Sequence, residues 1–222
     1  MDPNTVLSAD EVTITYHDPS RGRTIAIVED MDIAVSRGDL FCIAGRSGSG
    51  KTSILKVLAG LSRPPAGNVQ WLGKPIGELT DDERADRRRQ QVGYVDQSSF
   101  LIEDLSALEN VLIPVVPDGH HAVKRARRDA TNLLSTLGLE HRLHHLPHTL
   151  SGGERQRIAF ARALIMKPRI LIADEPTASL DRYWADVVIR ALVDFIADGG
   201  AAVVASHDSA VLREAGTVIT LD

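Results

Sequence analysis

The segment at residues 45–52, with the letters GRSGSGKT, restricts the fold of this chain more than any other feature. It matches the pattern G-x-x-x-x-G-K-[ST]. An apolar run at residues 40–44 precedes it, and apolar residues recur with helical spacing over residues 51–61, which predicts a buried strand, a turn and a helix. Because a phosphate-binding loop needs this order of elements, we expect an α/β protein built around such a loop.

Phosphate binding explains why this loop contains three glycines. Gly45, Gly48 and Gly50 allow positive φ angles and let backbone N–H groups come close to phosphate oxygens. The following helix directs its positive end at the same place. Lys51 is expected to reach the β- and γ-phosphates of a nucleotide, and the Thr52 hydroxyl to ligate Mg²⁺. The nucleotide-binding residues predicted here are Gly45, Arg46, Ser47, Gly48, Ser49, Gly50, Lys51, Thr52 and Ser53.

Strand and helix patterns alternate along the rest of the chain, which predicts a mostly parallel sheet covered on both faces. A hydroxyl at Thr80 and a carboxylate at Glu83 predict a capping box that opens a short charged helix. Residues 98–149 have helical spacing, so we expect a helical subdomain inserted into a core formed by residues 1–97 and 150–222 of one domain. We expect strands at 91–96, 170–173, 201–205 and 217–221, helices at 152–166 and 182–197, and an antiparallel β edge around 69–75.

Composition excludes several classes of protein. The chain has 222 residues, with 25 Lys and Arg against 30 Asp and Glu, so its net charge of −5 provides no global attraction for nucleic acid. No stretch without charged residues approaches the ~20 apolar residues that span a bilayer. The N-terminus does not have the pattern of a signal peptide, and the single cysteine, Cys42, suits a reducing compartment. We therefore expect a cytoplasmic protein.

A second polar site is predicted where an apolar strand, residues 170–173, ends at Asp174 and Glu175. Ligands of parallel α/β sheets lie beyond the carboxyl ends of the strands, where the phosphate loop also lies. Asp174 is therefore expected to hold Mg²⁺. Neighbouring strand residues point to opposite faces, which leaves Glu175 to face an attacking water as a general base.

The segment LSGGERQR at residues 150–157 makes a family resemblance specific. Together with the phosphate loop, VGYVDQ, ILIADEP, SLD and VVASHD in this order, it resembles the ATP-binding cassette family, the nucleotide-hydrolysing subunits of ABC transporters. The resemblance covers nearly the whole chain. It implies an ABC-type P-loop fold and hydrolysis of ATP to ADP and phosphate, with ATP and Mg²⁺ as cofactors.

The resemblance also implies residue roles. Tyr16 corresponds to the aromatic residue that stacks on adenine, a face that suits a flat ring. Gln97 corresponds to the glutamine that contacts Mg²⁺ and the attacking water, and His207 to the histidine near the γ-phosphate. The expected catalytic residues are Glu175, His207, Gln97 and Lys51, the metal ligands are Thr52, Gln97 and Asp174, and the second copy contributes Ser151, Gly152, Gly153 and Asp181 to the nucleotide.

In such an assembly two copies would enclose two ATP molecules head to tail. A separately encoded transmembrane permease would be the second partner, and it would hold the chain at the inner face of the cell membrane. Phe100, Leu101, Ile102 and Leu105 are expected to line the groove that receives this partner. Glu154 stands where many members carry glutamine, as in cassettes of the lipoprotein-release, macrolide-export and cell-division type.

Alternatives remain at this stage. A soluble ABC-type ATPase that acts on nucleic acid or ribosomes is a second hypothesis, although the acidic balance of the chain argues against it. His141, His144, His145 and His148 are spaced so that a zinc site has to be considered, but Pro147 interrupts any helix there. Trp71 and Trp184 receive no role.

Overall fold

A five-stranded parallel sheet, in the strand order β6-β7-β8-β3-β9, carries the fold. The computed structural model describes residues 2, 4–18 and 22–221. Within it, all four strand pairs of this sheet are parallel. The predicted strands are confirmed, with β3 at Leu40–Gly45, β6 at Val92–Val95, β7 at Ile170–Asp174, β8 at Ala201–Ala205 and β9 at Thr217–Leu221.

A second, antiparallel sheet has the order β2-β1-β4-β5. Its edge is the predicted hairpin, in which Trp71 pairs with Lys74. Sequence patterns did not predict the long pair β1 and β2, because register shifts interrupt the alternation of apolar residues and Glu11 and Asp30 have positive φ. The strands are β1 at Thr5–Asp18, β2 at Arg23–Ser36, β4 at Ala66–Trp71 and β5 at Lys74–Pro75.

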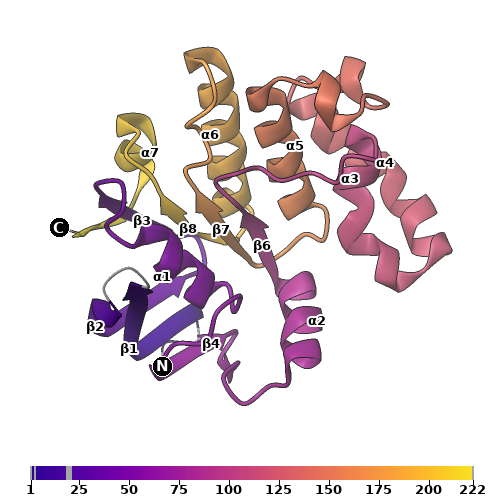
Figure 1. The fold of residues 1–222 in the computed structure, drawn as a ribbon. Coiled ribbons are helices and arrows are strands. Elements are labelled where there is room, and N and C mark those ends of the chain that lie inside the picture. The colour runs from indigo at the N-terminus through magenta and orange to yellow at the C-terminus, as the bar shows by residue number, and fades with distance from the viewer. Residues whose placement is uncertain (1, 3, 19–21, 222) are drawn as a thin grey trace.

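Helix α1 (Lys51–Leu58) lies between the two sheets, and helices α5, α6 and α7 cover the other face of the parallel sheet (Figure 1). Strand β7 shows the division: Ile170 and Ile172 pack toward α1, whereas Leu171 and Ala173 pack toward the opposite helices. The predicted helices are α5 at Gly152–Leu164 and α6 at Arg182–Ala197, and α7 at Ser209–Glu214 was not predicted.

The segment between β6 and α5 is helical, as its spacing predicts, and it forms the right-hand part of Figure 1. Its elements are α3 at Ala107–Leu112, η1 at Ile113–Asp118, α4 at His120–Thr136, η2 at Glu140–Arg142 and η3 at Pro147–Thr149. Before it, α2 (Asp81–Gln91) begins with the predicted capping box of Thr80 and Glu83. No helix among the described residues combines the length and the apolar character needed to cross a membrane.

Of the two tryptophans, Trp71 is buried and Trp184 is half-buried. The Trp71 indole is buried and donates to the Leu58 carbonyl at 2.9 Å. The Trp184 ring lies over Gly138, where a Cβ atom would come within 2.0 Å of it, and the Arg157 guanidinium stacks on the ring at 3.6 Å. These contacts join the starts of α5 and α6 to the end of α4. Cys42 is buried in β3 and belongs to the apolar core.

Candidate functional site

The loop from β3 to α1 surrounds the ammonium group of Lys51. The Lys51 Nζ donates to the carbonyls of Gly45 at 2.7 Å and Arg46 at 2.9 Å, so two of its three N–H donors hold the loop closed. Gly48 and Gly50 have φ angles of +83° and +96°, which favour glycine. The loop has the shape of an anion cradle at the N-terminus of α1.

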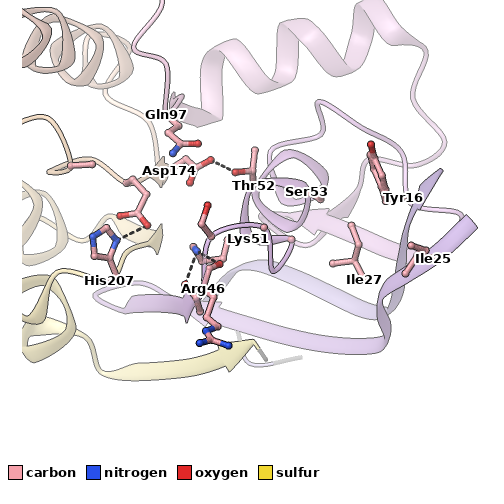
Figure 2. A pocket seen from close by; sticks show the side chains of 16 residues that line it. Tyr16, Ile25, Ile27, Arg46, Lys51, Thr52, Ser53, Gln97, Asp174 and His207 are labelled. Carbon is pink, nitrogen blue, oxygen red and sulfur yellow. Dashed lines mark hydrogen bonds and ion pairs between the residues drawn. The ribbon is translucent and has the colours of Figure 1, made fainter. Parts of the chain in front are cut away.

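A cleft of 720 Å³ opens beside this loop at the carboxyl ends of the parallel strands. Figure 2 shows Lys51 near the centre and Arg46 below it, with Gln97, Asp174 and His207 on one side and Tyr16 on the other. Of the predicted nucleotide-binding loop residues, all except Ser49 line the cleft; the Ser49 hydroxyl is buried and has no hydrogen-bond partner among the described residues. The lining residues are Tyr16, Ile25, Ile27, Gly45, Arg46, Ser47, Gly48, Gly50, Lys51, Thr52, Ser53, Gln97, Asp174, Glu175, Ala178 and His207.

Thr52 and Asp174 meet although 122 residues separate them, since the Thr52 hydroxyl donates to the Asp174 carboxylate at 2.6 Å. The pKa of Asp174 is raised above its ordinary value, mainly by burial. The hydrogen bond from Thr52 lowers this pKa, and the nearby carboxylate of Glu175 raises it further. A divalent cation stabilises the ionised form of a carboxylate that is buried beside a second carboxylate. A hydroxyl and a carboxylate are hard oxygen donors, which fit Mg²⁺.

No group of three or more His, Cys, Asp or Glu side chains in the described part of the chain forms a metal site by itself. In nucleotide sites, Mg²⁺ is commonly held by one or two carboxylates together with phosphate oxygens. Gln97 lines the same cleft and can add an amide oxygen.

Glu175 and His207 form a pair at the ends of β7 and β8. The Glu175 Oε1 lies 2.9 Å from the His207 Nδ1, and the Glu175 backbone N–H donates to the Ala205 carbonyl at 2.9 Å. Glu175 is buried, whereas the His207 side chain is 74% exposed. The φ of Glu175 is +50°, a strained value for a residue with a side chain, which turns the carboxylate out of the strand and into the cleft.

Gln156 holds the backbone of Glu175 in place. The sequence analysis did not predict this role of Gln156. Its side-chain amide donates to the Glu175 carbonyl at 2.7 Å and accepts from the Ser179 N–H at 3.0 Å. Gln156 is 1% exposed, on the buried face of α5. The sequence signal that could have identified this residue is a glutamine on the apolar side of a helix, because a buried amide needs hydrogen-bond partners.

The wall of the cleft around Tyr16 is apolar. Tyr16 is 55% exposed, and Ile25 and Ile27 of β2 line the cleft with it (Figure 2). The structure thus places Tyr16 where a planar ring can stack on a flat face. The two isoleucines were missed because β2 itself was not predicted.

The remaining predicted residues lie elsewhere. Ser151, Gly152, Gly153 and Asp181 are not among the described residues that line the cleft. Ser151 caps α5 and Asp181 caps α6, and both cap residues are exposed. The two helix starts are neighbours, because a Cβ atom on Gly153 would lie 3.0 Å from the Ser179 carbonyl oxygen. The candidate site therefore consists of two separate groups on one chain.

Known proteins match both the sequence and the fold. Residues 28–178 match the family described as ABC transporter. The chain is 40% identical over 198 residues to the lipoprotein-releasing system ATP-binding protein LolD of Zymomonas mobilis, covering 89% of this chain and 85% of that protein. It is 38% identical over 208 residues to the macrolide export ATP-binding/permease protein MacB of Pectobacterium atrosepticum, covering 94% of this chain. The chain spans only 32% of the length of that protein.

Solved structures match over nearly the whole fold. The dimeric, post-hydrolysis structure of the ATP-binding cassette MJ0796 bound to ADP and Pi has a TM-score of 0.91 and 34% sequence identity. The match covers 97% of this chain and 94% of that one. Another dimeric structure of the same bacterial ABC transporter cassette has a TM-score of 0.88.

Proposed function

Because the chain belongs to the ABC transporter family, we propose that it is an ATP-binding cassette that hydrolyses ATP to ADP and phosphate to drive a transmembrane partner. The observation that carries this function is the 720 Å³ cleft, in which Lys51, the pair of Thr52 and Asp174, and the pair of Glu175 and His207 all meet.

The arrangement of these residues supports hydrolysis by direct attack of a water molecule on the γ-phosphorus of ATP. The Lys51 ammonium and the loop N–H groups bind the β- and γ-phosphates. Glu175 takes a proton from a water molecule, whose oxygen forms a bond to the γ-phosphorus while the bond to the β–γ bridging oxygen breaks. His207 orients Glu175 through the contact at 2.9 Å. Mg²⁺, held by Thr52, Asp174 and Gln97, would neutralise charge on the phosphate oxygens.

The second group of residues acts in trans. Ser151, Gly152 and Gly153 form the N-terminus of α5, an anion-binding end, and they are not among the described residues that line the cleft of their own chain. In a head-to-tail dimer, this end and Asp181 of one copy would cap the ATP bound by Lys51 of the other. The dimeric cassettes among the structural relatives support this assembly.

A permease is the partner that fits this cassette. The name of the MacB relative joins ATP-binding and permease functions, whereas that of the LolD relatives describes an ATP-binding protein of a releasing system. We expect this chain to work with a separately encoded permease and to lie at the inner face of the cell membrane through it. Residues 98–149, the helical subdomain, would transmit the motion.

The contact with this partner is proposed at a groove of 450 Å³ between α2, β6 and the helical segment. Phe100 and Ile102 line it and are 67% and 41% exposed. Leu101 and Leu105, predicted to line this surface as well, are not among the described residues that line it, and Leu101 is 2% exposed and packs in the core, so that part of the prediction is wrong. Arg162 also lines the groove and donates to the Phe100 carbonyl at 2.7 Å.

Replacing Phe100 with glutamate is expected to reduce recovery of the permease at least tenfold in pull-downs from solubilised membranes, because a charge would be buried against an apolar helix. Nucleotide affinity should not change, since Phe100 is outside the cleft. Val218→Glu is the matched control, an exposed apolar residue on β9. Equal recovery with Phe100→Glu and Val218→Glu contradicts this docking site.

The hydrolysis itself is tested by the dependence of activity on protein concentration. If two copies form each active site, specific activity of the purified chain with Mg²⁺ and ATP should rise with protein concentration before it reaches a plateau. Phosphate release measured over a hundredfold range of concentration gives the answer. A specific activity that is constant over this range while the chain stays monomeric contradicts hydrolysis in a dimer.

A further inference from the structure

Glu154 brings a negative charge to the helix end that, under the proposed function, receives the γ-phosphate of a second copy. It is the third residue of α5, and its Oε2 accepts from the Ser151 N–H at 2.8 Å. Burial opposes ionisation of Glu154, but hydrogen bonds from Ser151 and Arg142 outweigh it and hold the pKa of Glu154 below its ordinary value. An ionised carboxylate and a phosphate at one helix end repel each other.

Arg142 supplies the compensating charge. Its Nε donates to the Glu154 Oε1 at 2.8 Å, and the Glu154 side chain is only 16% exposed. Arg157 is a second cation whose charge acts on Glu154. Its guanidinium is engaged differently, since it donates to the Leu137 carbonyl at 2.8 Å and stacks on Trp184. Arg142 is therefore the cation that forms the ion pair with Glu154.

The helical segment holds Arg142 in place. The Arg142 Nη1 lies 3.2 Å from the His145 Nε2, and because a guanidinium can only donate, this imidazole nitrogen is the acceptor. The backbone N–H groups of Ala107 and Leu108 donate to the carbonyls of His145 and Leu143 at 2.9 and 3.0 Å. The ion pair thus connects η2 to the start of α5, and the backbone hydrogen bonds connect the segment after η2 to the start of α3.

We propose that Arg142 is a positioning residue of the composite nucleotide site, which neutralises Glu154 so that the N-terminus of α5 accepts the γ-phosphate held by a second copy of the chain. This inference rests on the proposed function. It explains why a chain with glutamate at position 154 also needs a cation at this place: with Arg142 removed, the uncompensated carboxylate repels the incoming phosphate. With glutamine at position 154, that repulsion is absent.

The test is a double-mutant cycle in the hydrolysis-deficient Glu175→Gln background. ATP-dependent dimerisation is measured by sedimentation for the background, for Arg142→Gln, for Glu154→Gln and for the two together. Arg142→Gln is expected to weaken dimerisation about tenfold for each composite site, which is about 100-fold for two sites. Glu154→Gln should stay within about threefold of the background and should restore the double variant to the same range.

Two controls distinguish a failure of the role of Arg142 from a failure of the proposed dimer. Lys167→Gln removes a different surface ion pair, with Asp129, and should leave dimerisation unchanged. ATP affinity of the monomer should be the same in all variants. A double variant as weak as Arg142→Gln, or an Arg142→Gln variant equal to the background, overturns the role of Arg142 alone. A background that stays monomeric with ATP overturns the sandwich, and the role of Arg142 with it.

Discussion

Glutamine in place of Glu175 is expected to slow ATP hydrolysis by about 10²–10⁴-fold, the usual contribution of a general base. The amide has nearly the same shape and can still accept a hydrogen bond from the His207 Nδ1, which lies 2.9 Å from the carboxylate. It cannot take a proton from water at neutral pH. Binding of ATP should remain, because Lys51 and the loop N–H groups are unchanged.

The measurement is phosphate release at saturating Mg²⁺ and ATP, together with ATP affinity by calorimetry. Glu214→Gln is the matched control, since this exposed carboxylate on α7 lies outside the cleft and should keep the parental rate. Parental turnover in the Glu175→Gln variant would show that another group is the base.

Alanine in place of Lys51 is expected to weaken ATP binding about 100-fold or more. The one N–H donor of the ammonium group that the loop carbonyls leave free provides a charge-assisted hydrogen bond to a phosphate oxygen, with up to about 3 kcal/mol, which corresponds to about 100-fold in affinity. The substitution also removes the two hydrogen bonds to the carbonyls of Gly45 and Arg46 that hold the loop closed.

Lys56→Ala is the control for Lys51→Ala, because Lys56 is an exposed lysine on the same helix and does not line the cleft. ATP affinity measured by calorimetry should be unchanged in Lys56→Ala, and the thermal midpoint of both variants should remain close to that of the parent. Tight ATP binding by Lys51→Ala contradicts the assignment of the phosphate site.

The sequence predicted the parallel sheet and its loop well, because both depend on local patterns. Apolar runs such as that ending at Asp174 have the length of buried strands, and the glycines before Lys51 mark the turn. The capping box at Thr80 was also predicted and is present. In each case neighbouring residues alone carry the physical signal.

Contacts between distant segments were not predictable in the same way. The hydrogen bonds of Gln156 to Glu175 and Ser179 depend on how α5 packs against the end of β7. The apolar wall of Ile25 and Ile27 depends on β2, whose register shifts hide its alternation. The ion pair of Arg142 with Glu154 joins residues that periodicity does not relate.

The sandwich of two chains around ATP is tested most directly by sedimentation of the Glu175→Gln variant at a saturating ATP concentration. The account predicts a chain that is monomeric without nucleotide and sediments with twice the monomer mass once ATP is added. A variant that binds ATP with parental affinity and yet keeps the mass of one chain at every protein concentration would contradict it.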